Sequence, residues 1–378
     1  MTASSIAMPV DELKAWLRLT LSPGVGNETA RKLLAIFGSA QAVFAQSAAT
    51  LREAGSERLA ASLQDEPETL ADLLARTLAW LEGGASRRVV ALGDAAYPTA
   101  LLDIEDPPVL LYMLGALDSV PDAAACLAMV GSRNPTPQGE ANAHQFAHTL
   151  AASGLCVVSG LALGVDGAAH AGALAGGGTT IAVVGTGLDR VYPKKHLALA
   201  HRIAENGLLI SEFPLGTPPL TSNFPKRNRI ISGLTQATLV VEGAIKSGSL
   251  ITARMAAEQG KDVFAIPGSI HSPQSKGCHL LIKQGAKLVE SAQDILEELR
   301  PASGAPRVAI GDAEAEDDAP AGESALLAAL GFDMVSLDAL QARTGLPTAE
   351  LQAELLALEL DGQLARLPGG LFQRLAVA

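Results

Sequence analysis

The sequence has few cysteines, few aromatic side chains and no long apolar run. Its three cysteines, Cys126, Cys156 and Cys278, are odd in number and show no C-x-x-C spacing. This pattern argues against a disulfide framework and a zinc site, and we interpret all three as small core residues. The longest apolar runs, such as Thr179 to Val184 and Ala237 to Val241, have the length of a strand. A helix that crosses a bilayer needs about 20 apolar residues, so we expect no membrane segment.

Signatures of targeting, metal binding and nucleotide chemistry are also missing. No basic segment followed by an apolar run begins the chain, so we expect no secretory signal and a cytoplasmic location. The seven histidines show no metal-ligand spacing, and neither a Walker P-loop nor a G-x-G-x-x-G fingerprint occurs. The sequence therefore predicts no metal, no cofactor and no NAD-dependent or ATP-driven chemistry. With 48% hydrophobic residues in 378, it predicts a folded chain of two or three domains.

Positive charge is scarce overall, and the formal net charge is −12. Residues 1–125 carry 9 Lys/Arg against 16 Asp/Glu, residues 126–300 carry 15 against 12, and residues 301–378 carry 4 against 12. The central segment is therefore +3 (15 − 12), and it contains the densest basic cluster, SNFPKRNRIISG, between Ser222 and Gly233. The acidity of the whole chain does not exclude a polyanion site in its centre.

Residues 1–80 predict a helical domain that resembles a SAM-like helix-hairpin-helix. Gly24 and Gly26 form a Gly-x-Gly turn that opens a helix from Glu28 to Phe37. Such a turn can direct backbone N–H groups at a phosphate. In the alternative interpretation, which we favour, the glycines only make the turn, because Glu28 stands where a phosphate would come.

Residues 87–300 predict the core of the protein. Short apolar segments alternate with helical patterns, which indicates a parallel, doubly wound α/β sheet. The expected strands are 88–92, 109–113, 127–130, 155–158, 180–184, 208–211, 238–241 and 263–266.

The C-terminal residues predict a linker and a third domain. Residues 301–322 combine Pro, Gly and Ala with five carboxylates, a composition typical of an acidic flexible linker. Residues 323–378 give three helical segments and a hairpin across Pro368 to Gly370, the order of a winged helix. Its expected recognition helix, Thr348 to Leu360, carries three glutamates and no base. This favours a partner-binding or packing role over the alternative of DNA reading.

Unusual residues follow the predicted strands, and ligands of open parallel sheets bind beyond the carboxyl ends of the strands. Glycines and serines there allow close approach of a phosphate to the backbone, and Arg133 adds a fork of donors. A single glycine loop would indicate only a tight turn, but several at one sheet edge favour a binding site. The candidate loop residues are Gly131, Ser132, Arg133, Gly160, Gly164, Ser247, Gly248 and Ser249.

The basic cluster supplies the remaining candidates. Its apolar neighbours indicate a half-buried segment with fixed cations, whereas a solvated charged face is the alternative. Phe224 is available to stack on a nucleobase. Lys226, Arg227 and Arg229 are expected to bind phosphates, with Asn228 between them.

A catalytic group is harder to find. Asp166 and His170 are four residues apart on an expected helix and could meet, but capping and turn hydrogen bonds explain them more simply. Glu212 and Glu242, each just after a strand, could pair as acid and base, or anchor Arg227 and Arg229 in ion pairs. We therefore predict no catalytic residues.

The motifs together resemble one family. GSR, SGLALGVDGAAH, GTGLDRVYPKKH, SEFPLGTPP, NFPKRNRIISGL, EGAIKSGSLITARMAAEQGKDVFAIPG and KGCHLLIKQGAKLV are similar to those of the DNA processing protein A family, DprA or Smf, over about residues 88 to 300. The resemblance implies an extended Rossmann-like fold that forms a homodimer in the bacterial cytoplasm. It implies binding and protection of single-stranded DNA, and loading of the RecA recombinase during natural transformation. By correspondence, Arg133, Lys194 and the basic motif would bind the DNA.

Two other functions remain open. A Rossmann-like enzyme acting on a free nucleotide is the first, since cytokinin-activating phosphoribohydrolases resemble this general architecture, although their P-G-G-x-G-T signature is missing. A pure adaptor is the second. The expected partners are thus single-stranded DNA, RecA and a second copy of the chain, without a membrane.

Overall fold

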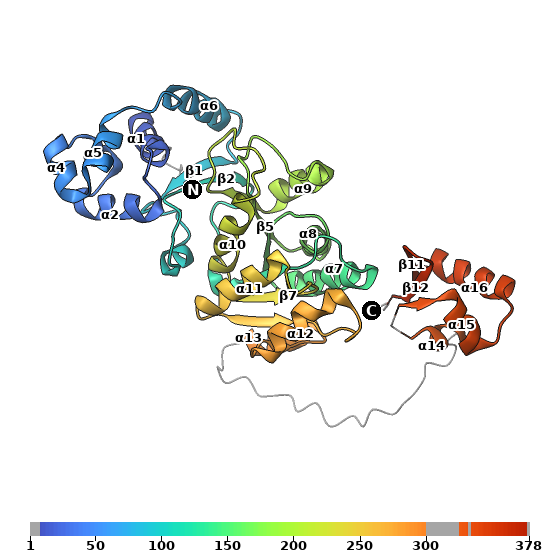
Figure 1. Ribbon diagram of the computed structural model, residues 1–378. Helices are drawn as coiled ribbons and strands as arrows, with labels where there is room; N and C mark the ends of the chain where they lie inside the picture. Colours follow the sequence, from blue (N-terminus) through green and yellow to red (C-terminus); the bar gives the residue numbers. More distant parts are fainter. Residues whose placement is uncertain (1–7, 300–324, 332–333, 376–378) are drawn as a thin grey trace.

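The computed structural model describes residues 8–299, 325–331 and 334–375. The expected acidic linker, 301–322, lies outside these residues. The described part holds an N-terminal group of helices, a large sheet covered by helices on both faces, and a small C-terminal domain (Figure 1). No helix in it is long and apolar enough to cross a bilayer. The N-terminal helices are α1 (Val10–Leu21), α2 (Asn27–Phe37), α3 (Ala40–Phe44), α4 (Ala48–Ala54), α5 (Glu57–Gln64) and α6 (Leu70–Glu82).

The predicted hairpin turn precedes α2. Gly26 is its N-cap residue, and Gly24 has φ +80°, which a residue with a side chain rarely adopts. The first two turns of α2 contact the core, since Asn27 Nδ2 donates to Asp106 Oδ2 (3.1 Å) and Arg31 Nη1 to Asp106 Oδ1 (3.0 Å). This carboxylate of the core lies near the start of the helix, which favours the interpretation that the glycines only make the turn.

The central sheet has nine strands in the order β1-β2-β6-β5-β4-β3-β7-β8-β9. The parallel, doubly wound arrangement is confirmed from β6 to β9, whereas β1 and β2 are antiparallel and extend one edge. The strands are β1 (Arg87–Ala91), β2 (Leu110–Gly115), β3 (Cys126–Val130), β4 (Cys156–Ser159), β5 (Thr180–Val183), β6 (Leu208–Ser211), β7 (Ala237–Val240), β8 (Asp262–Ala265) and β9 (Lys287–Leu288). The sequence did not predict β9, which is only two residues long.

Strand side chains alternate between two cores, as the period of a strand requires. On one face, Cys126, Ala128 and Val130 of β3 pack in the same cluster as residues of α10 (Asn223–Gly233), α11 (Gly248–Glu258) and α12 (Lys276–Lys283). On the other face, Leu127 and Met129 pack with α7 (Pro137–Ala152), α8 (Val165–Ala175) and α13 (Ala292–Leu299). Helix α9 (Leu197–Asn206) packs with the N-terminal cluster. All three cysteines are free and buried, as predicted.

The chain reverses its direction of travel across the sheet next to β3. It proceeds from β3 to β4, β5 and β6 on one side, and then places β7, β8 and β9 on the other. Loops after β3 and β7 therefore diverge on opposite sides and leave a crevice between them. Such a switch point is where open α/β sheets bind ligands. Short 3₁₀ helices complete the core: η1 (Thr99–Asp103), η2 (Ala123–Ala125), η3 (Lys194–His196) and η4 (Pro273–Ser275).

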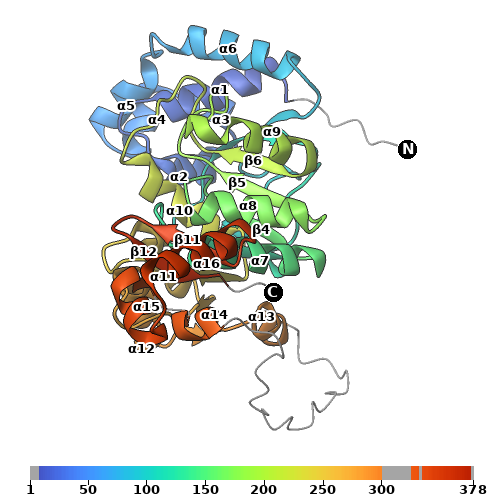
Figure 2. The same cartoon turned by 90° about the vertical axis from the view of Figure 1, so that its right-hand side faces the viewer.

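The C-terminal domain is a winged helix around its own core, in which Leu340, Leu351 and Phe372 are buried. Its sheet has the order β10-β12-β11, and the hairpin β11–β12 was predicted. The domain lies in front of the core in the view of Figure 2, and its strand β12 contacts α7. Its elements are α14 (Ala325–Leu330), β10 (Val335–Ser336), α15 (Leu337–Thr344), α16 (Thr348–Leu360), β11 (Leu364–Leu367) and β12 (Leu371–Arg374).

Candidate nucleic-acid interface

A crevice of about 640 Å³ opens at the switch point between β3 and β7. One wall is the loop after β3, the other is the loop after β7, and the start of α10 lies between them. It brings together most of the predicted loop residues and part of the basic cluster. The predicted residues that line it are Gly131, Ser132, Arg133, Phe224, Arg227, Asn228, Ser247, Gly248 and Ser249.

Aromatic rings stand at the mouth of this crevice. Tyr192 and Phe224 have ring centroids 5.6 Å apart with an interplanar angle of 40°. Tyr192 is 45% exposed, and the guanidinium of Arg133 lies 5.4 Å from the centroid of Phe224. An exposed ring next to a cation offers an unstacked base a π face and its phosphate a positive charge.

Two cations in the crevice form no ion pair with any residue that the structure describes. Arg133 and Lys246 are both exposed, and neither has a carboxylate oxygen within 4.0 Å among the residues that the structure describes. Lys246 and Tyr192 were not predicted. Both lie in loops that follow predicted strands, EGAIKSGSL and GTGLDRVYPKKH. Their position after a strand was the feature of the sequence that could have identified them as site residues.

The loop after β7 is shaped by small residues. Ser247 caps α11, because its Oγ accepts a hydrogen bond from the backbone N–H of Ser249 (3.3 Å). A Cβ on Gly248 would meet no heavy atom within 4 Å. The first turn of an eleven-residue helix thus faces open space in the crevice, where its backbone N–H groups favour an anion.

Arg227 lies under the crevice and is nearly enclosed. It is 4% exposed, and its Nη1 donates to the carbonyls of Gly160 (2.5 Å) and Val183. Burial lowers the pKa of Arg227 to about 10, and the nearby Asp166 carboxylate opposes that shift. The predicted phosphate contact is therefore revised: Arg227 joins the loop after β4 to the end of β5 and contributes positive potential from below.

Arg229 points away from the crevice and is 8% exposed. Its two terminal nitrogens donate to Glu212 at 2.7 Å each, and its Nε donates to Asp106 (3.2 Å). Hydrogen bonds and charge from these carboxylates outweigh burial and raise the pKa of Arg229. Its charge is already neutralised, so here too the expected phosphate contact is revised, and the predicted Glu212 ion pair is confirmed.

The other predicted residues lie at the margins. Lys226 is half exposed and pairs with Glu212 at 3.6 Å. Lys194 is exposed on η3, two residues beyond Tyr192, and does not line the crevice. Gly160 and Gly164 support the walls instead of lining them, since a Cβ on Gly160 would stand 2.1 Å from the Arg227 guanidinium, and Gly164 has φ +77° at the start of α8.

The acidic candidates are engaged in structure. Glu242 accepts from the backbone N–H (2.9 Å) and hydroxyl (2.6 Å) of Thr136 at the start of α7, so it does not anchor an arginine as expected. Asp166 accepts from the N–H of Ala162 (3.2 Å), which confirms a turn hydrogen bond. His170 Nδ1 lies 2.7 Å from Thr180 Oγ1, so His170 and Asp166 have different partners. The described residues around the crevice thus present no acid and base pair.

Comparison with known proteins identifies the family of the chain. Residues 88–300 match a family described as DNA recombination-mediator protein A. The chain belongs to the DprA/Smf family. Residues 10–69 match a DprA-like N-terminal helix-hairpin-helix domain, and residues 311–370 match a DprA winged helix domain.

Relatives of the DprA/Smf family include Protein Smf of Escherichia coli, 44% identical over 78% of this chain and 79% of that protein. The X-ray structure of DprA from Streptococcus pneumoniae is similar with a TM-score of 0.63 and 36% identity, over 78% of this chain and 100% of that one. A Helicobacter pylori DprA structure, described as giving insight into a single-stranded DNA binding mode, is similar with a TM-score of 0.51 and 31% identity. It covers 56% of this chain and 95% of that one.

Proposed function

We propose that the chain binds single-stranded DNA in the crevice between β3 and β7. The observation that carries this proposal is that Arg133 and Lys246, which form no ion pair among the described residues, lie beside the exposed ring of Tyr192 and the half-buried ring of Phe224. In single-strand binding sites, cations bind the phosphates and aromatic rings stack on the bases. A duplex keeps its bases stacked inside, so the rings favour a single strand.

Membership of the DprA/Smf family supports a role in DNA processing. We propose that this cytoplasmic protein processes DNA in natural transformation, protecting incoming single strands and loading RecA on them. The H. pylori relative, whose structure is described by its single-stranded DNA binding mode, supports the choice of ligand. The absence of an acid and base pair at the crevice, in the part of the chain that is described, favours binding over catalysis on a free nucleotide.

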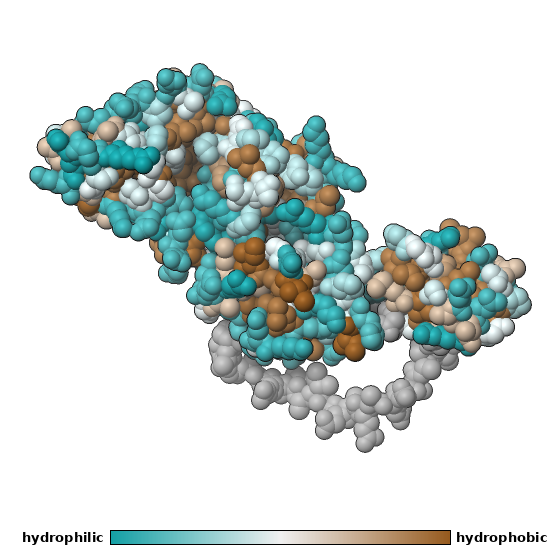
Figure 3. Space-filling model, viewed as in Figure 1, coloured by the Kyte–Doolittle hydropathy of each residue, from teal (hydrophilic) through white to brown (hydrophobic). Residues whose placement is uncertain are grey.

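We also propose a homodimer. Apolar residues gather on the surface over α11 and α12 (Figure 3), where Ile245 is 59% and Ile251 38% exposed. A second copy would remove this surface from water. Sedimentation velocity of the Ile251→Glu variant, compared with the unchanged chain, tests the dimer contact. A carboxylate buried in the contact would shift the population to monomer. An unchanged sedimentation coefficient would contradict the proposed contact.

The binding proposal is tested by titrating fluorescently labelled single-stranded and double-stranded oligonucleotides of equal length. We expect preference for the single strand, reduced at least about tenfold by the double variant Arg133→Ala, Lys246→Ala. Lys283→Ala is the matched control, since Lys283 is an exposed lysine on α12 outside the crevice. Equal affinity for both DNA forms, or a double variant that binds like Lys283→Ala, would refute the assignment. Release of base from nucleoside monophosphates would support the enzyme alternative.

A further inference from the structure

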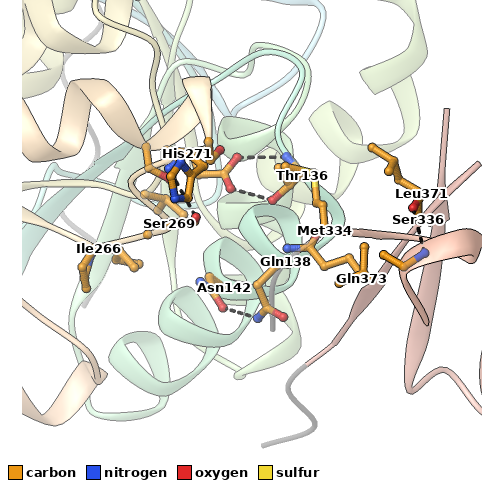
Figure 4. A pocket seen from close by; sticks show the side chains of 18 of the residues that line it. Thr136, Gln138, Asn142, Ile266, Ser269, His271, Met334, Ser336, Leu371 and Gln373 are labelled. Atoms are coloured by element: carbon orange, nitrogen blue, oxygen red, sulfur yellow. Dashed lines mark hydrogen bonds between the residues drawn. The ribbon is translucent and has the colours of Figure 1, made fainter. Parts of the chain in front are cut away.

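A second cleft lies between the core and the winged helix, with a volume of about 730 Å³. The core contributes the first turns of α7 and the loop after β8, which runs from Ile266 to Ser275. The winged helix contributes residues of β10, α15 and β12. Figure 4 shows Met334, Leu371 and Gln373 of the winged helix on the side of Gln138 and Asn142 of α7 and of its N-cap residue, Thr136. The volume falls in the range of about 300–1,000 Å³ that is common for sites of small organic groups.

The lining is mostly neutral. Hydroxyl and amide groups alternate with apolar surface, as in sites for uncharged heteroaromatic rings. Among the described lining residues, Glu242 is the one carboxylate, and Thr136 occupies both of its oxygens. Arg343 is the one arginine, and it is exposed at the rim. A free anion would find little charge inside, whereas a base could enter with its phosphate near Arg343.

Gln373 gives an independent sign of a missing ligand. It is 7% exposed, and its Oε1 has no hydrogen-bond partner among the residues that the structure describes. Its neighbour Phe372 packs into the winged-helix core, so strand alternation turns Gln373 to the opposite face, where it lines the cleft. A buried acceptor without a donor is costly, and an N–H group of a base would supply the donor.

The cleft adjoins the crevice through one shared loop. Gln274 lines the crevice, and its Nε2 donates to the carbonyl of Asn134 (3.1 Å) on the opposite wall. His271, Ser272 and Ser275 of the same loop line the cleft. A strand that leaves the crevice on the side of Gln274 would meet residues of the same loop that line the cleft.

We propose that the cleft receives a base of the single strand as it leaves the crevice, so the winged helix holds DNA by this face and not by acidic α16. The inference rests on the proposed function. It explains why a domain with a glutamate-bearing recognition helix stands beside a DNA crevice. The core and the winged helix together close around the strand, with Gln373 bonded to the edge of the base.

The test measures affinity against length with the full chain. Labelled oligothymidylates from about 6 to about 20 nucleotides are titrated, a range that spans common single-strand site sizes. We expect an increase in affinity of about five- to tenfold once the oligonucleotide reaches both sites. Gln373→Leu removes the acceptor, and Ser269→Trp fills the cleft from the core side without changing the winged helix. Both variants should lose the gain for long oligonucleotides and bind short ones like the unchanged chain.

Gln352→Leu, the same substitution at an exposed position of α16, is the matched control and should keep the gain. Photo-cross-linking of 5-iododeoxyuridine oligonucleotides should label Met334 or His271 in addition to the crevice residues. The inference is overturned if long oligonucleotides gain no affinity, if Ser269→Trp keeps the gain, or if cross-links stay confined to Tyr192 and Phe224. If the unchanged chain binds neither short nor long oligonucleotides, the proposed function itself has failed.

Discussion

Arg229 and Glu212 form a two-point ion pair, with Nη1–Oε1 and Nη2–Oε2 distances of 2.7 Å. Both side chains are nearly buried, at 10% and 4% exposed. The pair joins α10 to the residue that follows β6, and Asp106 extends it to Arg31 of the N-terminal domain. Helix α10 also carries Phe224 and Asn228 of the crevice. The ion pair therefore fixes the position of the binding surface relative to two domains.

Replacing Arg229 by methionine should destabilise the protein. Removing one partner leaves the Glu212 carboxylate buried without its bidentate donor, which costs about 3–5 kcal/mol in the free energy of unfolding. Urea denaturation of Arg229→Met measures the loss. Lys226→Met is the control, because Lys226 is 50% exposed and lies 3.6 Å from the same carboxylate, so its loss should be small. Similar stability of the two variants would contradict the structural role of Arg229.

The salt dependence of DNA binding should separate free from neutralised cations. Each phosphate contact to a single strand contributes about −0.7 to the slope of log affinity against log salt concentration. Arg133→Ala should therefore make the slope shallower by about 0.7. Lys283→Ala should leave it unchanged. A slope that Arg133→Ala does not alter would show that this cation meets no phosphate.

The aromatic pair should contribute through its ring faces. Tyr192→Ser removes an exposed ring and should weaken binding of single-stranded DNA by about 1–3 kcal/mol. Tyr192→Phe keeps the ring and should bind within about twofold of the unchanged chain. Fluorescence anisotropy measures both. If the phenylalanine variant is as weak as the serine variant, the hydroxyl carries the contact and stacking does not.

Gly160 should not tolerate a side chain. A Cβ there would stand 2.1 Å from the Arg227 guanidinium, so Gly160→Ala must displace an arginine that is held by two carbonyls. We expect a loss of about 1–3 kcal/mol in stability, measured by urea denaturation. Gly84→Ala is the control, since its Cβ would meet only Ser86 Oγ, at 3.8 Å. Equal stability of the two variants would mean that Arg227 is not confined as described.

His170 should make the fold sensitive to acid. Burial lowers its pKa to about 3 from an ordinary value of 6.5. Below pH 6.5 the unfolded chain thus takes up a proton at His170 that the folded chain does not. The contribution of neutral His170 to the free energy of unfolding is therefore complete above pH 6.5 and is lost as the pH falls toward 3. The loss is about 1.4 kcal/mol per pH unit within that window.

A chain with His170→Gln should lose this part of the acid sensitivity, because glutamine does not titrate. His144→Gln is the control, since His144 is exposed. Urea unfolding between pH 7 and pH 4 compares the three proteins. If His170→Gln and His144→Gln show the same pH dependence as the unchanged chain, His170 does not control it.

The local pattern of apolar, glycine and proline residues was sufficient to predict most elements of the fold. Strands β3 to β8 were predicted because buried parallel strands are short apolar runs between helical repeats, and the hairpin β11–β12 because glycine and proline mark its turn. The antiparallel pairing of β2 with β1 and β6 was not predicted, because strand direction depends on partners distant in the chain. Strand β9 escaped detection because two residues carry no periodicity.

For the candidate site, the amino-acid sequence alone indicated the sheet edge at which the loops gather, since parallel strands bring their carboxyl ends to one edge. Which of these loops line the crevice depended on the tertiary structure, because Gly160, Gly164 and Lys194 do not line it and Gln274 does. Only the tertiary structure decided which cations are available. Lys226, Arg227 and Arg229 look equivalent in the sequence, yet Arg227 is held by backbone carbonyls and Arg229 by Glu212 and Asp106. Lys246, which stands apart from that cluster, has no such partner among the described residues. The physical reason is that a charge is neutralised by neighbours in space, and those neighbours come from other strands and helices.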